Sequence, residues 1–175
     1  ARLLPNAEPP HKISIIARGM ALGYTKMLED DHYLQSSSQM NDKIAVLLSG
    51  HAAEKLIFGE ISSGVHDDIK RATYIARTMV TDLGMSEKLG PITFERARRP
   101  MFIEAVMPPS TKDYSETTAQ EIDREVALLA ERAHRRAREV LEKQRPILEK
   151  VAALLLEKEV LEGDELREIL NEAKR

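Results

Sequence analysis

Apolar residues recur every three to four positions through the middle of the chain, and this spacing constrains the fold more than any other feature. One such run covers residues 40–56 and is followed closely by Gly59. A second covers residues 69–83 and is followed at once by Gly84. Residues three and four apart share one face of a helix, and glycine commonly follows a helix end. We therefore predict two core helices joined by a turn at 62–64.

The last third of the chain has the same periodicity over a longer distance. Ser115 is a good N-cap for a helix whose apolar stripe covers residues 122–141. Pro146 should kink or restart this helix, because it lacks a backbone donor and collides with the preceding turn. A further apolar-faced helix is expected at 147–156, and a last short one at 163–170. We expect this region to form a helical hairpin that packs on the rest.

The N-terminal region has a different pattern. Residues 1–10 end in two prolines, and residues 3–4 fit the last turn of a helix that starts upstream. Residues 11–18 are rich in β-branched side chains, and glycines at 19 and 23 bracket the next short segment. The pattern predicts a small sheet such as a hairpin. A polar stretch at 29–38 carries serines that can cap the first core helix.

Composition agrees with a mainly α fold class. Hydrophobic residues make up 42% of the 175 residues and charged residues 31%, whereas aromatic residues are only 4%. The formal net charge of -3 offers no overall attraction for phosphate backbones, so we expect no nucleic-acid partner. Because the chain has no cysteine, any metal would need histidine and carboxylate ligands. The longest apolar runs are too short to span a bilayer.

The length suits one domain over residues 1–175. Within it we expect the helix end and small sheet at 1–38 and the core helices at 39–90. Four prolines and a basic run predict an irregular, mobile loop at 91–114. The C-terminal helical subdomain then covers 115–175.

Two adjacent aspartates, Asp67 and Asp68, stand just after Gly64 at the start of the second core helix. Acidic residues there are commonly explained by capping and by the positive end of the helix dipole. The same position can supply a hard oxygen ligand to zinc. From the residues alone capping is the simpler interpretation, and the two aspartates are interchangeable.

The sequence gives weaker evidence for other metal-binding or catalytic residues. His51 and Glu54 share a helix face and partly match the inverted zinc motif His-x-x-Glu-His, but Lys55 stands in place of its second histidine. His66 lies beside Asp67 and could ligate a metal, although a lone loop histidine usually faces solvent. The remaining histidines, at 11, 32 and 134, have no partner at metal-binding spacing. The chain contains no His-Glu-x-x-His, no phosphate-binding glycine loop and no Gly-x-Ser-x-Gly elbow.

Several motifs in one order resemble the peptidase domain of FtsH-type proteases. They lie at 3–7, 11–19, 21–25, 52–54, 63–73, 84–91 and 114–123. The family consists of membrane-anchored, ATP-dependent zinc metalloproteases in which an AAA+ ATPase ring feeds unfolded polypeptide to a ring of six peptidase domains. The resemblance implies that the His-Glu-x-x-His helix, with two zinc ligands and the general base, lies a few residues upstream of Ala1.

The resemblance also assigns roles to residues of this chain. Aligning Gly64 and the Ile-Lys pair at 69–70 selects Asp68 as the third zinc ligand and leaves Asp67 with the helix end. Glu54 matches a glutamate near the site and is expected to support the ligands rather than bind the metal. The segment Leu22-Gly23-Tyr24 is expected to present a strand edge to the substrate backbone. Departures from the family pattern occur at Ala17, His51 and Asp67, where proline, arginine and asparagine are usual.

The implied function is the proteolytic part of an ATP-dependent zinc metalloprotease that degrades unfolded or membrane proteins for quality control. The implied cofactor is zinc, with ATP and magnesium confined to the ATPase module of the full-length chain. Expected partners are unfolded polypeptides and other copies in a hexamer, with contact to an inner or plasma membrane only through N-terminal segments absent here. The peptidase domain would then face the cytoplasm or its organellar equivalent. The alternative is an inactive homologue or fragment that forms a ring as a scaffold.

Overall fold

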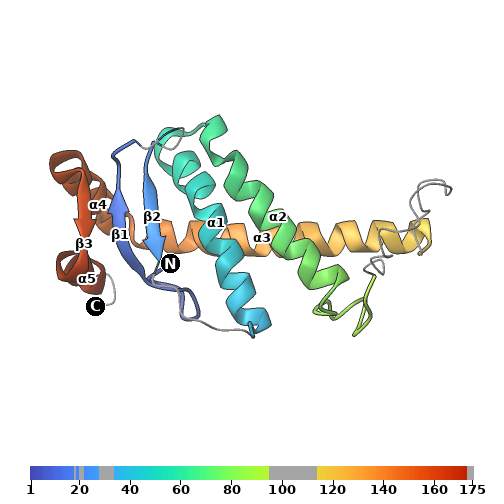
Figure 1. Cartoon of the computed structure of the whole chain (residues 1–175). Helices are drawn as coiled ribbons and strands as arrows, with labels where there is room; N and C mark the ends of the chain where they lie inside the picture. Colours follow the sequence, from blue (N-terminus) through green and yellow to red (C-terminus); the bar gives the residue numbers. More distant parts are fainter. Residues whose placement is uncertain (18, 20–21, 28–33, 95–113, 173–175) are drawn as a thin grey trace.

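The computed structural model describes residues 1–175 except 18, 20–21, 28–33, 95–113 and 173–175. Most of the described residues are helical, and a small sheet lies beside the helices (Figure 1). In chain order the elements are β1 (Pro10–Ser14), β2 (Tyr24–Met27), α1 (Ser37–Phe58), the 3-10 helix η1 (Ser63–Val65), α2 (His66–Thr81), α3 (Glu116–Lys143), α4 (Arg145–Lys158), β3 (Val160–Glu162) and α5 (Gly163–Glu172). The mainly α fold class is therefore confirmed.

The boundaries of α1 follow from local chemistry. Ser36 and Gln39 form a capping box, in which the Ser36 hydroxyl accepts from the Gln39 N–H and the Gln39 side chain accepts from the Ser36 N–H. Gly59 ends the helix in the left-handed conformation, which glycine adopts without steric cost. The serine cap and the glycine stop expected from the sequence are both present.

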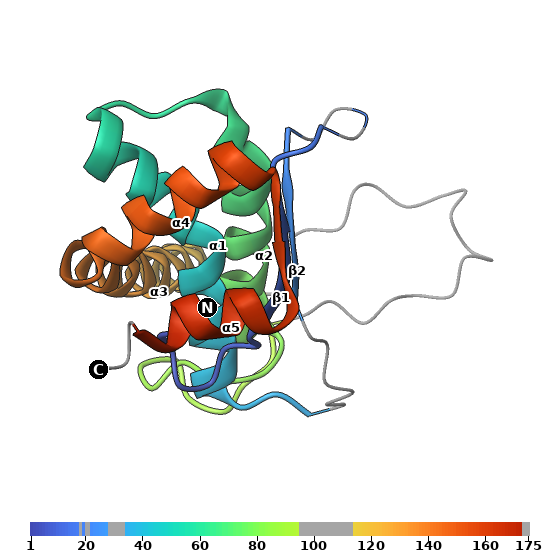
Figure 2. The same cartoon turned by 90° about the vertical axis from the view of Figure 1, so that its left-hand side faces the viewer.

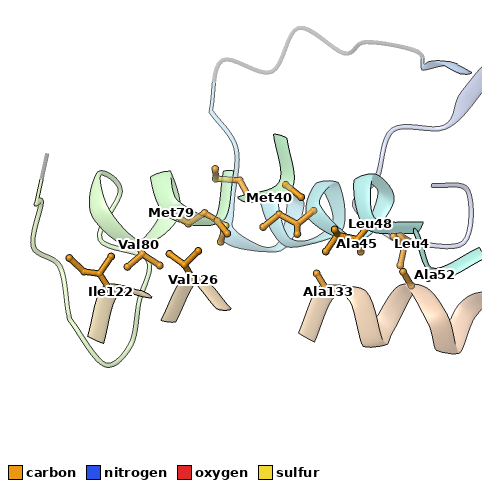
Figure 3. Close-up of a cluster of buried hydrophobic side chains, with 14 residues drawn as sticks. Leu4, Met40, Ala45, Leu48, Ala52, Met79, Val80, Ile122, Val126 and Ala133 are labelled. Carbon is orange, nitrogen blue, oxygen red and sulfur yellow. The ribbon is translucent and has the colours of Figure 1, made fainter. Parts of the chain in front are cut away.

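The main core lies between α1, α2 and α3, which pack on one another along their apolar faces (Figure 3). Alanine is the most frequent of its buried side chains, and these small residues let the helices approach closely. The buried members are Leu4, Met40, Ile44, Ala45, Leu48, Ala52, Ala72, Ala76, Met79, Val80, Ile122, Val126, Ala133 and Ala137. The two stripes predicted in the middle of the chain and the long C-terminal stripe thus meet in a single cluster.

Residues 1–9 do not extend a helix within the chain. They form successive turns, in which the Leu4 N–H donates to the Ala1 carbonyl over 2.9 Å, and Leu4 is buried in the main core. The segment is also held by Asp42 of α1, a fully buried carboxylate that accepts from the N–H and the side-chain amide of Asn6. Arg136 of α3 lies 2.9 Å from the same carboxylate. A polar contact therefore joins the N-terminal segment to α1 and α3.

The predicted hairpin is present, but the sheet has a third strand that the sequence analysis did not predict. The strand order is β2-β1-β3, and both neighbours are antiparallel to β1. Because β3 comes from the C-terminal region, the two ends of the described chain meet in one sheet. Figure 2 views this sheet edge-on, with α4 and α5 on one side of it.

The C-terminal helices differ in arrangement from the expected hairpin. Gln144 ends α3, and Pro146 stands in the first turn of α4, so the proline restarts the helix. Instead of lying along α3, α4 packs with β3 and α5 around a second cluster, formed by Val151, Leu155, Leu161, Leu166 and Ile169. The central part of the expected 91–114 loop lies outside the described residues.

Candidate metal centre

Asp68 is the third residue of α2 and is partly buried. No described residue donates a hydrogen bond to its carboxylate or pairs with it as an ion. The N-cap of α2 is Val65, which provides no side-chain cap. The backbone of η1 continues into the helix instead, and the His66 N–H donates to the Ser63 carbonyl. An unengaged carboxylate at a fixed helical position fits a ligand to a divalent metal, which prefers oxygen or nitrogen donors where thiolates are absent.

Asp67 precedes it and is exposed to solvent. Its carboxylate likewise has no hydrogen-bond partner among the described residues, so the capping expected of Asp67 does not take the form of a hydrogen bond. What remains is a favourable interaction with the positive end of the helix dipole, which applies to both aspartates. The two differ instead in burial, and Asp68 is the less exposed.

Glu54 of α1 is fully engaged by a single residue of the turn before α2. The Ser62 N–H donates to Glu54 Oε2 over 2.7 Å, and the Ser62 hydroxyl donates to Glu54 Oε1 over 2.8 Å. The Ser62 N–H and then its hydroxyl lower the pKa of the Glu54 carboxyl, because both stabilise the charged form. Each oxygen of Glu54 therefore accepts one hydrogen bond from Ser62, and both hydrogen bonds favour the charged carboxylate.

The histidines do not gather around Asp68. His66 is exposed at the start of α2, and His32 lies outside the described residues. His51 and His134, which carried no metal signal in the sequence, contact each other between α1 and α3, with His51 Nδ1 3.0 Å from His134 Nε2. The 83 positions that separate them hide this pair from any local motif.

No group of three or more histidine, cysteine, aspartate or glutamate side chains that could hold a metal forms among the residues that the structure describes. Asp68 thus stands as one donor, and a complete zinc site requires further ligands. This chain supplies three features of a candidate site. They are the partial burial of Asp68 at the start of α2, its carboxylate without a described partner, and the Glu54–Ser62 contact just before the helix.

The expected substrate strand lies at an edge of the sheet. Tyr24 begins β2 and pairs with Ser14 of β1, while Leu22 and Gly23 precede the strand, Leu22 being 86% exposed. Gly23 passes close to β1, since a Cβ there would lie 2.7 Å from the Ser14 carbonyl oxygen. In the three-stranded order β2 pairs with β1 on one side only. Among the described helices, none combines the length and hydropathy that a bilayer crossing requires.

Comparison with known proteins gives one consistent result. The profile of peptidase family M41 matches residues 1–169. The chain is 46% identical over 176 residues to the ATP-dependent zinc metalloprotease FtsH of Syntrophobacter fumaroxidans, covering 99% of this chain and 27% of that protein. It is 47% identical over 172 residues to the ATP-dependent zinc metalloprotease FtsH of Thermotoga maritima, covering 97% of this chain and 28% of that protein.

A similar relation holds with the ATP-dependent zinc metalloprotease FtsH of Pseudothermotoga lettingae, at 48% identity over 170 residues, 96% of this chain and 27% of that protein. The chain therefore spans about a quarter of the length of the relatives that it matches. The match covers all the described elements from β1 to β3. On this agreement of sequence along almost the whole chain, the protein belongs to the FtsH-type peptidases of peptidase family M41.

Proposed function

We propose that this chain is the proteolytic part of an ATP-dependent zinc metalloprotease and that Asp68 is one of its zinc ligands. The observation that carries the proposal is the partly buried Asp68 carboxylate at the start of α2, which no described residue engages. The names of the relatives support both the zinc and the ATP dependence. The other two ligands and the general base would come from a His-Glu-x-x-His helix N-terminal to Ala1.

The roles of the residues in hand follow from their positions. Asp68 would hold the metal through a carboxylate oxygen, and the backbone of α2 fixes where that oxygen can point. The chemistry that zinc supplies when bound is polarisation of a peptide carbonyl and activation of water. Glu54 would keep the turn before α2 in place through Ser62, which donates one hydrogen bond to each of its oxygens, and would support the metal site rather than bind the metal.

Substrate would enter as an extended chain beside β2. An edge strand presents unpaired backbone groups to a further strand, and a protease that must accept many sequences gains from reading the backbone rather than side chains. Exposed Leu22 and the Tyr24–Met27 strand would form that edge. Unfolded polypeptide would be delivered by an AAA+ ATPase module in the full-length protein, whose peptidase domains would form a hexameric ring anchored to a membrane and serve quality control.

The metal assignment is tested with two neighbouring variants of the full-length protein. Asp68→Ala should lose bound zinc, measured by metal analysis after dialysis, and should lose cleavage of an unfolded protein such as casein. Asp67→Ala is the matched control, because it removes the same group one position earlier and should keep both properties. Full zinc content in Asp68→Ala would overturn the ligand assignment.

The substrate strand has its own test. Backbone N–H groups of adjacent residues in a strand point to opposite sides, so only one of Thr25 and Lys26 directs its N–H away from β1. Proline at that position should raise the KM for unfolded substrate and leave the unfolding temperature nearly unchanged, whereas proline at the other should destabilise the sheet. If both variants left KM unchanged, the edge would not bind substrate.

Ring formation is tested by light scattering on the full-length protein. A hexamer that keeps its mass in Asp68→Ala but cleaves nothing would separate assembly from catalysis. A hexamer that lacks zinc and activity in the unaltered protein would instead favour the scaffold function.

A further inference from the structure

The contact between Glu54 and Ser62 is bidentate, with one hydrogen bond to each carboxylate oxygen. One oxygen accepts from the Ser62 N–H over 2.7 Å and the other from the Ser62 hydroxyl over 2.8 Å. Hydrogen bonds to an ionised acceptor are stronger than those between neutral groups. The Ser62 hydroxyl in turn accepts from the Gly64 N–H over 3.2 Å. Ser62 therefore links Glu54 of α1 to Gly64 of η1.

From Ser62 to Asp68 the chain has no irregular segment. Ser62 is the N-cap of η1, and η1 continues directly into α2, where Asp68 is the third residue. The residues after Ser62 along this path lie in η1 or α2, and helical backbone geometry places each of them. A shift at Ser62 is thus carried to Asp68 instead of being absorbed by a loop.

The start of α2 has few other anchors. Val65 is buried, but the next buried residue along the helix is Ala72, and the positions between them are exposed or half-buried. The packing of the later turns of α2 on α1 and α3 sets the direction of the helix. The single buried side chain at its start leaves the position of the first turn less constrained, because apolar packing is not directional. Paired hydrogen bonds to a carboxylate are directional. Gly64 fits this arrangement closely, since a Cβ there would lie 3.3 Å from the Ser62 hydroxyl oxygen.

We propose that Ser62 is a positioning residue for the metal site: held by both oxygens of Glu54, it fixes the position of the first turn of α2, which carries the Asp68 carboxylate. The proposal rests on the proposed role of Asp68 as a zinc ligand and extends it to a residue that does not touch the metal. Residues that orient metal ligands typically change metal affinity by about 10-fold to 100-fold when substituted.

The test measures zinc affinity of the full-length protein by competition with a chromogenic chelator, and the unfolding temperature of the zinc-free form. Ser62→Ala removes the hydroxyl and should weaken zinc binding about 10-fold. Ser62→Thr keeps both the hydroxyl and the N–H, and the exposed, extended backbone at position 62 accepts a β-branched residue, so it should restore the affinity.

Ser86 provides a matched control elsewhere in the fold. Its hydroxyl donates to Glu125 of α3 over 2.7 Å and accepts from the Leu89 N–H over 3.2 Å, so it makes the same kind of contact at the other end of α2. Ser86→Ala should lower the unfolding temperature and leave zinc affinity unchanged. Equal zinc affinity in Ser62→Ala and the unaltered protein would overturn the proposal.

Two further variants separate the possible failures. Asp68→Asn tests the ligand itself: if it loses zinc while Ser62→Ala does not, the metal site stands and only the positioning role fails. If Asp68→Asn keeps zinc, the proposed function fails at its ligand. The double variant Glu54→Gln with Ser62→Ala should lose less zinc affinity than the sum of the two single losses, because both changes weaken the same contact between Glu54 and Ser62. Losses that add in full would show that the two residues act independently and would overturn the proposal.

Discussion

The Nδ1 of His51 on α1 lies 3.0 Å from the Nε2 of His134 on α3, and the two rings meet edge to face. One nitrogen must donate and the other accept, so at least one ring is neutral when the contact forms. Glu54 lies near His51, and Arg138 lies near His134. Burial, the charge of His51 and the charge of Arg138 together lower the pKa of His134.

This pair predicts a loss of stability on acidification. A His134 pKa below the ordinary 6.5 means that the unfolded chain binds the proton more readily than the folded chain, so the free energy of unfolding rises with pH. The stabilisation is present above pH 6.5 and is lost as the pH falls below it. Urea unfolding between about pH 7.5 and 5.5 measures the slope. His134→Gln should flatten it, whereas His66→Gln, a change at an exposed histidine, should not; equal slopes in all three proteins would contradict the prediction.

The buried Asp42 predicts a large effect from one arginine and a small one from its neighbour. Arg136→Ala leaves a fully buried carboxylate with only the donors of Asn6, and should cost about 3 kcal/mol of unfolding free energy. Arg135→Ala removes an exposed ion pair with Glu131 one position earlier and should cost less than about 0.5 kcal/mol. Denaturant unfolding measures the free energy of unfolding of both variants. Similar losses would show that the buried ion pair stabilises the protein no more than the exposed one.

Substitution of glycine by alanine should have opposite effects on stability at two positions, Gly23 and Gly50. Gly23→Ala should destabilise the protein, because its Cβ would lie 2.7 Å from the Ser14 carbonyl oxygen and force β1 and β2 apart. Gly50→Ala, inside α1 with nothing within 4 Å of the added Cβ, should stabilise by up to about 1 kcal/mol. Thermal unfolding measures both. A rise in unfolding temperature for Gly23→Ala would mean that the close approach of the strands is not required.

The third strand predicts that the C-terminal region stabilises the sheet. Leu161 of β3 is fully buried, and Leu161→Ala should cost about 3 kcal/mol. Since β3 pairs with β1, amide exchange should also speed up in β1. Leu156→Ala on the exposed side of α4 is the control and should change neither quantity by much. If Leu161→Ala left the amide exchange of β1 unchanged, the sheet would not depend on the second cluster for its stability, and the prediction would be wrong.

The helices could be predicted because their signals are local. The stripe from Met40 onward, the serine before α1 and the glycine after it act within a few residues of one another, and each appears in the structure as expected. The start of α3 at Ser115 and the restart at Pro146 are local in the same sense. Their physical cause, helical periodicity with capping, requires no knowledge of what the helix packs against.

The sheet was only half predictable. The β1–β2 hairpin joins neighbours in the chain, but β3 pairs with a strand almost 150 positions earlier. Its three residues, set between α4 and α5, are too few to display the alternation that identifies a strand. Only packing of Leu161 against the second cluster and pairing with β1 make it a strand.

The candidate site was also only partly predictable from the sequence. By itself the sequence determined that an acidic pair begins the second core helix and that the chain resembles a zinc peptidase, because spacing and motif order are properties of the chain alone. The tertiary structure decided that Ser62 engages Glu54, that Asp68 is the less exposed aspartate and that His51 meets His134. Those relations join separate elements, and such contacts arise only when the helices have packed.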